Sequence, residues 1–244
     1  MKSIFITGAS SGIGEHLAYL YSSKGVTLGL SARRVSELNR VAKKCEDLGA
    51  KVFIYPLDVK NRIDLKNAIE DFASKNETLD CVIANAGIGE NENILSGDAS
   101  KINNVIETNL LGVTNTLLPA IPYMKKQKFG KLVAISSVAS YIPTPNNSGY
   151  SSSKSGVRML MDGFRLKLTR FGISCITICP GFIDTPIVSK THATPMILEV
   201  EVGVKKIANA IGKNKKNFIF PWQYKFILPI LRFIPDWILI KLMN

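Results

Sequence analysis

The sequence predicts an α/β fold built on one parallel β-sheet with helices on both faces, the doubly wound arrangement. Short apolar runs rich in β-branched residues alternate along the chain with longer segments of helical periodicity. Strands that alternate with helices form βαβ units, which place their strands in parallel. The 244 residues are 46% hydrophobic, enough for a sizeable core, and no linker, repeat or low-complexity tract divides them. We therefore expect a single sheet of about seven strands in one domain.

Each expected strand is a short apolar run bounded by polar or turn-forming residues. The seven runs are residues 3–7, 26–32, 51–56, 81–84, 131–136, 174–179 and 218–220. Helical patterns lie between them, near residues 12–24, 35–48, 61–75, 98–126, 151–171 and 200–213. Strands that are apolar almost throughout indicate a sheet buried on both faces.

The composition narrows the classes of partner. A net charge of +12 suits nucleic acid, an anionic membrane surface or a polyanionic small molecule. The lysines are scattered in short groups such as KNKK at 213–216, without a recognition motif, so we expect no nucleic-acid binding. Four cysteines without a CxxC pair and only two histidines argue against a metal site and predict buried, reduced thiols. No charged region followed by an apolar signal segment opens the chain, and we expect a cytoplasmic protein.

A glycine-rich turn follows the first strand. The stretch TGASSGIG, residues 7–14, has its glycines at G-x-x-x-G-x-G spacing where strand gives way to helix. Glycine permits a sharp turn and the close approach of a diphosphate to the helix N-terminus, which attracts anions. The spacing differs from the general G-x-G-x-x-G fingerprint, and a turn without a ligand is the alternative. The residues expected to contact a dinucleotide here are Gly8, Ser10, Ser11, Gly12, Ile13 and Gly14.

The end of the second strand predicts which dinucleotide binds. A carboxylate at this point would bind the ribose 2′-hydroxyl of NAD, but the strand ends in LSARRV, with Ser31, Arg33 and Arg34. A guanidinium fork matches a phosphate, so NADP(H) is favoured over NAD. The alternative is that the two arginines only end a surface strand.

A tyrosine and a lysine stand four residues apart in GYSSSKSG, residues 149–156. On a helix this spacing puts Tyr150 and Lys154 on one face, where the ammonium can act on the phenol. A tyrosine ring can also pack on the methylene chain of a lysine without any function, so the pair alone does not show a catalytic site.

Together these residues resemble the classical short-chain dehydrogenase/reductase family, from Lys2 to about Phe220. The likeness adds to the glycine turn an ordered set of motifs: LDV with Asp58, NAG at 85–87, Asn109 in TNLLG, Ser137 in ISSVAS, Tyr150-x-x-x-Lys154, and PG at 180–181. It implies a Rossmann-type sheet of order 3-2-1-4-5-6-7, a nicotinamide cofactor, and homodimers or homotetramers.

The resemblance also implies a role for each residue of the site. Tyr150 would be the general acid/base, and its pKa of about 10 would have to fall toward neutrality. Lys154 and the positive charge of the oxidised nicotinamide would stabilise the phenolate, and Lys154 would touch the nicotinamide ribose. Ser137 would bond the substrate oxygen, and its neighbour Ser136 should point to the opposite face of the strand. Asn109 would hold a water that links Lys154 to solvent.

The remaining implied cofactor contacts follow the strand ends. They are Asp58, Val59, Asn85, Ala86, Gly87, Pro180, Gly181, Ile183 and Thr185, beside Tyr150 and Lys154 themselves. Thr185 would bond the nicotinamide carboxamide. For Asp58, a helix N-cap is the alternative to a contact with the adenine.

Two segments go beyond these motifs. Residues 186–200 are expected to form a mobile flap over the substrate, with an apolar wall made by Ile187, Val188, Met196, Ile197 and Leu198. His192, in this flap, is expected to line the pocket or face solvent, and His16 to be structural. Residues 1–220 would then be the cofactor-binding part with its flap, and residues 221–244 an apolar, basic, helical extension of the same domain.

The extension leaves three alternatives open. Pro229 and Pro235 should break any single helix, which disfavours a membrane span. The segment can pack over the substrate mouth or a partner subunit, lie in a membrane interface with its tryptophans and cations at headgroup level, or act as an inhibitory or partner-binding element.

The sequence thus predicts an NADP(H)-dependent oxidoreductase that interconverts a carbonyl and a secondary alcohol, acting as a reductase on an apolar small molecule. The alternative is a catalytically silent protein that senses a dinucleotide for regulation or as a scaffold. The presence of Ser137, Tyr150 and Lys154 together favours the enzyme.

Overall fold

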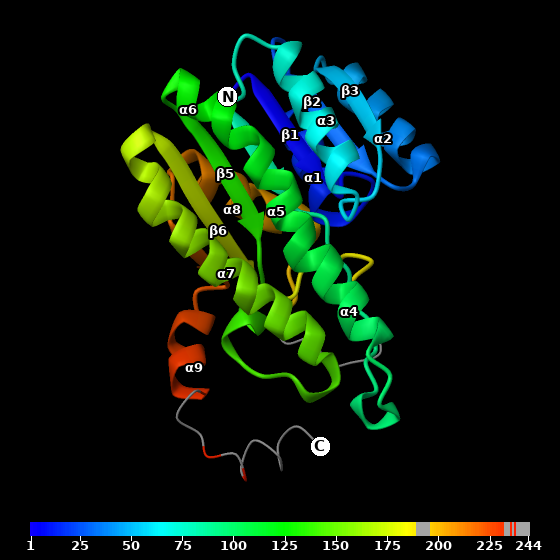
Figure 1. The fold of residues 1–244 in the computed structure, drawn as a ribbon, viewed down its shortest axis with the longest axis vertical. Coiled ribbons are helices and arrows are strands. Elements are labelled where there is room, and N and C mark those ends of the chain that lie inside the picture. The colour runs from blue at the N-terminus through cyan, green and yellow to red at the C-terminus, as the bar shows by residue number, and fades with distance from the viewer. Residues whose placement is uncertain (189–195, 232–234, 236, 238–244) are drawn as a thin grey trace.

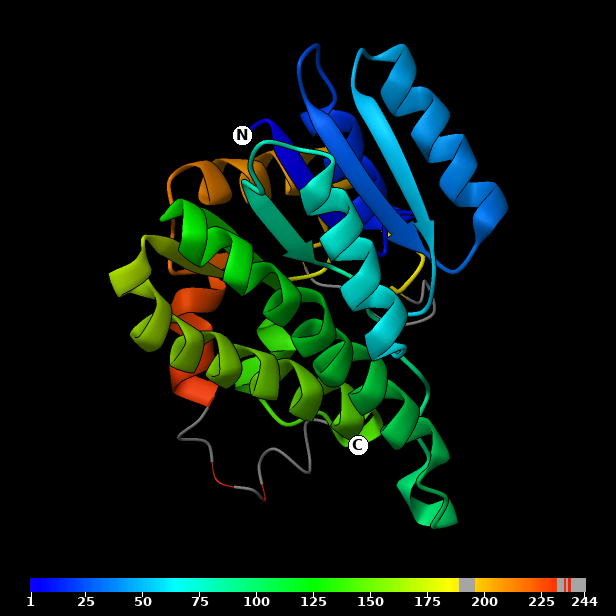
Figure 2. The same cartoon turned by 45° about the horizontal axis from the view of Figure 1, so that its top comes forward.

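The seven strands form one sheet in which every neighbouring pair is parallel, in the order β3-β2-β1-β4-β5-β6-β7. The structure, a computed structural model, describes residues 1–188, 196–231, 235 and 237. Figure 1 and Figure 2 show helices on both faces of the twisted sheet. The predicted doubly wound fold and its strand order are confirmed.

The strands lie where the apolar runs predict them. They are β1 (Ser3–Thr7), β2 (Thr27–Ala32), β3 (Lys51–Pro56), β4 (Cys81–Ala84), β5 (Gly130–Ile135), β6 (Ile173–Pro180) and β7 (Asn217–Phe220). Every predicted boundary is within one residue of the observed one, because β-branched runs between helices leave little choice of register.

The long α-helices also follow the predicted pattern. They are α1 (Gly12–Tyr21), α2 (Val35–Asp47), α3 (Arg62–Ser74), α7 (Ser148–Leu168) and α8 (Val200–Gly212), followed by α9 (Tyr224–Leu231). Short 3₁₀ turns connect several of these elements: η1 (Ile94–Ser96), η4 (Val138–Tyr141), η5 (Pro145–Asn147) and η6 (Thr169–Phe171).

The helical stretch predicted near 98–126 is divided into five consecutive pieces. These are α4 (Ser100–Ile106), a π-helical turn η2 (Glu107–Leu111), α5 (Gly112–Leu117), the 3₁₀ turn η3 (Leu118–Ala120) and α6 (Ile121–Gln127). The π-turn was not predicted, since one extra residue per turn leaves no clear mark on a hydrophobic pattern.

The core consists of two layers, one on each face of the sheet, and β1 contributes to both by alternation. Ile4 and Ile6 lie in the layer under α1, α2 and α8, and Phe5 lies in the layer under α3, α5 and α7. All three side chains are fully buried. With both faces covered, the site can form only along the edge where the strands end.

The C-terminal extension packs against the turn that follows β5. Tyr224 and Leu228, one helical turn apart in α9, form a small cluster with Val138 of η4. Pro229 lies within α9, which ends at Leu231, so this proline does not itself end the helix. That Pro229 and Pro235 together prevent one helix through the extension stays a prediction. In so short a helix the proline removes only one main-chain hydrogen bond. No helix in the described part of the chain is long and apolar enough to cross a membrane.

Candidate active site

The glycine turn between β1 and α1 is shaped to hold an anion. Gly8 and Gly12 have φ of +66° and +57°, which disfavour any side chain, and a Cβ on Gly14 would lie 2.3 Å from the Gly8 carbonyl oxygen. Ser11, the N-cap residue of α1, makes no side-chain capping bond, so the hydroxyl does not cover the first-turn N–H groups. The diphosphate of a dinucleotide fits this cradle and this helix end.

The end of β4 closes the turn from the other side. The Asn85 side-chain amide donates to the carbonyl oxygens of Thr7 (3.0 Å) and Gly8 (3.2 Å). A Cβ on Gly8 would lie 2.7 Å from the Ala86 Cα, so the two loops are in direct contact. Asn85 therefore holds the turn in shape, a role that the NAG motif did not reveal.

Two arginines mark the end of β2. Arg34 donates to the hydroxyls of Ser10 (3.0 Å) and Ser11 (2.7 Å), which ties it to the glycine turn. Arg33 is 60% exposed and lies 3.5 Å from the Asp58 carboxylate. Ser31, by contrast, is fully buried within the strand. Arg34 therefore borders the glycine turn directly, whereas Arg33 is paired with Asp58.

Asp58 and Val59 follow β3 at the same edge. The Asp58 carboxylate accepts from the Lys60 N–H (3.0 Å), while α3 is capped by Asn61 instead. The alternative that Asp58 is a helix N-cap is therefore wrong, and the residue combines a tight turn with its ion pair to Arg33. Val59 is buried, and its side chain lies 2.7 Å from the position of a Cβ on Gly112.

The four predicted catalytic residues come together near the carboxyl ends of β4 and β5. The Ser137 hydroxyl lies near the Tyr150 phenol and lowers its pKa. The Lys154 ammonium lies 5.6 Å from the centre of the Tyr150 ring and donates to the Ile135 carbonyl oxygen (3.0 Å). A Cβ on Gly87 would be 3.2 Å from the Asn109 Oδ1 and 3.3 Å from the Lys154 Nζ, so a side chain there would press on both groups.

Burial dominates the ionisation of the Tyr150–Lys154 pair. Desolvation raises the pKa of Tyr150, against a smaller lowering by the Ser137 hydrogen bond. Desolvation lowers the pKa of Lys154 to about 8. In the structure the pKa of the phenol is therefore raised, and its fall toward neutrality stays a prediction.

Ser136 and Ser137 are distinguished by their partners. The strand β5 ends at Ile135, so strand alternation does not govern the two serines. Ser136 donates to the main-chain oxygen of Lys154 (2.9 Å), whereas Ser137 accepts from the Ala139 N–H (3.1 Å) and lies near the Tyr150 phenol. Ser137 is thus the serine that shares a site with the phenol.

Asn109 lies in the π-turn and is fully buried. Its Oδ1 accepts from the Ile88 N–H (2.8 Å), and its Nδ2 donates to the Ile88 carbonyl oxygen (2.9 Å). Both ends of the amide therefore hold the loop that follows β4. The water relay through Asn109 stays a prediction.

The residues after β6 reach the cradle from the other side. Pro180 ends the strand, and the Gly181 N–H donates to the Phe220 carbonyl oxygen (2.7 Å). The Ile183 side chain is buried in the core. Thr185 lies beside the glycine turn, with its Cγ2 3.2 Å from the position of a Cβ on Gly12. The contact of Thr185 with the nicotinamide stays a prediction.

The predicted flap is described only at its two ends. Ile187, Met196 and Ile197 are partly exposed apolar side chains there, whereas Leu198 pairs with Ile183 and packs against the core. Val188 is half-buried. His192 lies outside the described residues. Leu198 thus belongs to the core. That Ile187, Val188, Met196 and Ile197 form an apolar pocket wall stays a prediction.

His16 and the cysteines have the structural surroundings expected for them. The His16 ring lies 2.8 Å from the Gly12 carbonyl oxygen through Nδ1 and 3.4 Å from the Glu201 carboxylate through Nε2. All four cysteines are free and buried, as the composition predicts.

Sequence reasoning missed one residue in contact with the catalytic helix. The Glu92 carboxylate accepts from the N–H groups of Gly149 (2.8 Å) and Tyr150 (3.1 Å). The partners are 57 and 58 positions apart in the sequence, and no spacing rule connects them.

Comparison with known proteins identifies the class to which this site belongs. A family model described as short chain dehydrogenase matches residues 2–195. A protein of Arabidopsis thaliana named 11-beta-hydroxysteroid dehydrogenase-like 2 is 36% identical over 245 aligned positions, covering 96% of this chain and 78% of its own. The chain therefore belongs to the short-chain dehydrogenase family of oxidoreductases.

Solved structures agree in fold. The alcohol dehydrogenase of the archaeon Thermococcus sibiricus, complexed with 5-hydroxy-NADP, has a TM-score of 0.79 at 27% identity, covering 90% of this chain and 96% of that one. A short chain dehydrogenase/reductase from Burkholderia phymatum in complex with NAD has a TM-score of 0.84 at 21% identity, covering 93% and 92%.

Proposed function

We propose that the protein is an NADP(H)-dependent reductase that converts the carbonyl group of an apolar small molecule to a secondary alcohol. The observation that carries the proposal is the joint placement of Ser137, Tyr150 and Lys154 beside the anion cradle of the glycine turn. A protein that only sensed a dinucleotide would need the cradle and not this acid/base group.

Each residue has a distinct task in the reaction. NADPH, when bound, supplies a hydride to the carbonyl carbon. The Ser137 hydroxyl donates a hydrogen bond to the carbonyl oxygen and stabilises the negative charge that develops there. The Tyr150 phenol donates its proton to the same oxygen, so the alcohol leaves neutral. The buried Lys154 ammonium stabilises the resulting phenolate until a proton returns from solvent.

The preference for NADP(H) rests on the two arginines. Two guanidinium groups at the edge of the cradle can bind a phosphate through charge-assisted hydrogen bonds. Asp58, the ion-pair partner of Arg33, neutralises part of this charge, which leaves Arg34 and the exposed face of Arg33 for the cofactor.

An apolar substrate is proposed from two observations. The exposed apolar side chains at both ends of the flap, Ile187, Met196 and Ile197, lie on the segment that follows the cofactor residue Thr185. The Arabidopsis relative carries the name of a hydroxysteroid dehydrogenase, a class with apolar substrates.

We further propose a homodimer or homotetramer formed through α7 and the helical segment beside it. Met159 and Leu166, seven residues apart on one face of α7, are 73% and 88% exposed. Leu111 and Leu118, on the neighbouring helical segment, are also exposed. Burial of these side chains in an interface is favourable at about 25 cal/mol per Å², and sedimentation of Leu166→Glu against the parent tests it.

A cytoplasmic location and a peripheral contact with membranes belong to the same proposal. Free, buried cysteines suit a reducing compartment. The solvent face of the extension carries Trp222, Phe226 and Trp237, which are 65%, 65% and 70% exposed. Exposed aromatic residues beside a lysine, Lys225, are the composition of a membrane interface.

The test starts with fluorescence titration of the purified protein with NADPH and NADH. NADPH consumption is then followed with decanal, cyclohexanone, nitrobenzaldehyde and a ketosteroid. We expect tighter binding of NADPH and turnover of at least one ketone. Arg33→Asp should weaken NADPH about 10- to 100-fold more than NADH, and Arg170→Asp, an exposed arginine on η6, is the matched control. Tight NADPH binding without any turnover would favour the dinucleotide sensor.

A further inference from the structure

The start of the catalytic helix is capped by a residue from another segment. Asn147, the N-cap residue of α7, makes no side-chain capping bond, and the next residue, Ser148, opens the helix. The second and third helical N–H groups, of Gly149 and Tyr150, both donate to the Glu92 carboxylate at 2.8 and 3.1 Å. These are the N–H groups that a helix's own N-cap side chain normally satisfies.

Glu92 is closely fitted to this position. Its side chain is only 5% exposed, and a Cβ on Gly149 would lie 2.9 Å from its Oε1. The main-chain N–H of Glu92 also donates to the Asn146 carbonyl oxygen (3.4 Å). A carboxylate at the first turn of a 21-residue helix is stabilised both by hydrogen bonds to N–H groups and by the helix dipole. A buried carboxylate needs such partners, because it has lost its water.

Glu92 belongs to a loop that joins three parts of the site. The loop begins after Gly87, and Ile88 is bonded at both its N–H and its carbonyl to Asn109. Four residues further on, Glu92 is bonded to the main chain of the proton donor Tyr150. The loop thus ties the cofactor edge of β4, the π-turn and the N-terminus of α7 into one unit.

We propose that Glu92 is a positioning residue for Tyr150, fixing the catalytic helix relative to the cofactor edge of the sheet. This inference rests on the proposed function for its catalytic consequence. The hydride goes to the carbon and the proton to the oxygen of the same carbonyl group. The phenol and the nicotinamide must therefore be held at fixed positions relative to each other. Displacement of a catalytic group by about 1 Å can cost about 100-fold in rate.

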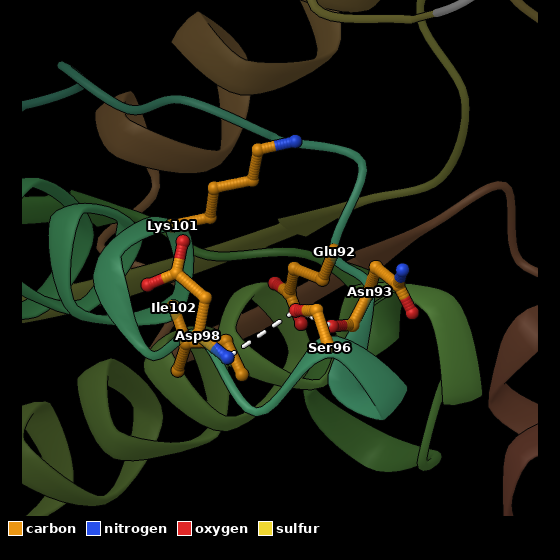
Figure 3. A pocket seen from close by; sticks show the side chains of 6 residues that line it. All are labelled: Glu92, Asn93, Ser96, Asp98, Lys101 and Ile102. Atoms are coloured by element: carbon orange, nitrogen blue, oxygen red, sulfur yellow. Dashed lines mark hydrogen bonds between the residues drawn. The ribbon is translucent and has the colours of Figure 1, made fainter.

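The same loop offers a matched control. Asp98 also accepts from a helix N–H, that of Ser100 (2.9 Å), but at the start of α4 and in an exposed position. Figure 3 shows Glu92 and Asp98 among the side chains that line one pocket of this loop. Glu92→Gln and Asp98→Asn therefore make the same chemical change to two caps, of which one holds Tyr150.

The experiment measures position and turnover separately. Hydrogen exchange of the Gly149 and Tyr150 amides is followed by NMR without substrate. Turnover is measured with NADPH and the best carbonyl of the panel, at a temperature where all variants are folded. We expect Glu92→Gln to remove the protection of both amides and to lower kcat about 10- to 100-fold, with the KM for NADPH within twofold of the parent. Asp98→Asn should change neither. Glu92→Asp, which keeps the charge but is one methylene shorter, should fall between parent and Glu92→Gln, and serves if Glu92→Gln does not fold.

Two results would overturn the inference. Fast exchange of both amides in the parent would show that the cap does not form. Loss of protection in Glu92→Gln with kcat unchanged would reduce Glu92 to a stabilising contact. Failure of the parent to turn over any carbonyl would instead refute the proposed reductase, and the exchange comparison would then decide the capping contact alone.

Discussion

Replacement of Lys154 by methionine should make the protein more stable at pH 7 while removing its activity. Lys154 is 4% exposed, and desolvation lowers its pKa from 10.5 to about 8. That shift corresponds to about 3 kcal/mol of folding free energy spent to keep the ammonium charged at pH 7. Methionine has a similar length and no charge, but it also loses the hydrogen bond to the Ile135 carbonyl, which costs about 1 kcal/mol.

The net gain expected at pH 7 is about 2 kcal/mol, or about 4–8 °C in Tm for a chain of this size. Its dependence on pH gives the sharper test. Between pH 8 and 10.5 the folded protein has lost the Lys154 proton while the unfolded chain keeps it, so the parent gains stability as the pH rises. The advantage of Lys154→Met should therefore shrink above pH 8 and disappear by about pH 10.

Urea unfolding of parent and variant, each without cofactor, at pH 7, 8, 9 and 10 measures this difference. Groups far from position 154 titrate equally in both proteins, so the difference reports Lys154 together with its neighbour Tyr150. A constant difference across the range, or a variant that is less stable at pH 7, would refute the assignment of a burial cost to the ammonium. We therefore expect that Lys154 lowers the stability of the fold and is retained for its role in catalysis.

Four further variants have expected outcomes. Tyr150→Phe should lower turnover by at least about 100-fold with NADPH binding unchanged in fluorescence titration, and retained turnover would remove the phenol from the mechanism. Gly14→Ala should destabilise the protein by at least about 1–3 kcal/mol in urea unfolding, because its Cβ would lie 2.3 Å from a carbonyl oxygen of the turn. Gly163→Ala, in open space on α7, should instead add about 1 kcal/mol, and equal effects at the two sites would contradict the steric argument. The double variant Trp222→Ser with Phe226→Ser should lose flotation with phosphatidylglycerol vesicles, and equal flotation of parent and variant would argue against a membrane interface.

Most of the architecture could be predicted from the sequence, because local patterns of residues determine it. Apolar runs predicted each strand to within one residue, and the glycines predicted a turn in which side chains do not fit. The motif series also brought Ser137, Tyr150 and Lys154 to one place. These features depend on spacing along the chain, which a single sequence displays.

The contacts that could not be predicted join distant segments through ordinary polar residues. Asn85 bonds the carbonyl oxygens of the glycine turn, and Glu92 caps α7 across 57 positions. The π-turn around Asn109 inserts one residue without interrupting the apolar pattern. Pro229 remained inside a helix because a short helix loses little by one missing donor. Each of these depends on tertiary geometry, which local propensity does not record.

The sheet order has a consequence for the nascent chain. β1 pairs with β2 on one side and with β4 on the other, although β4 lies more than seventy residues later in the sequence. While the ribosome makes the intervening segment, Ile4, Phe5 and Ile6 belong to a strand with one unpaired edge. Such an edge is a template for association with another chain. Synthesis that stalls before Cys81 should therefore yield an aggregation-prone fragment. The arrival of β4 covers this edge of β1 and closes the glycine turn, and the open edge then moves to β4 until β5 pairs with it.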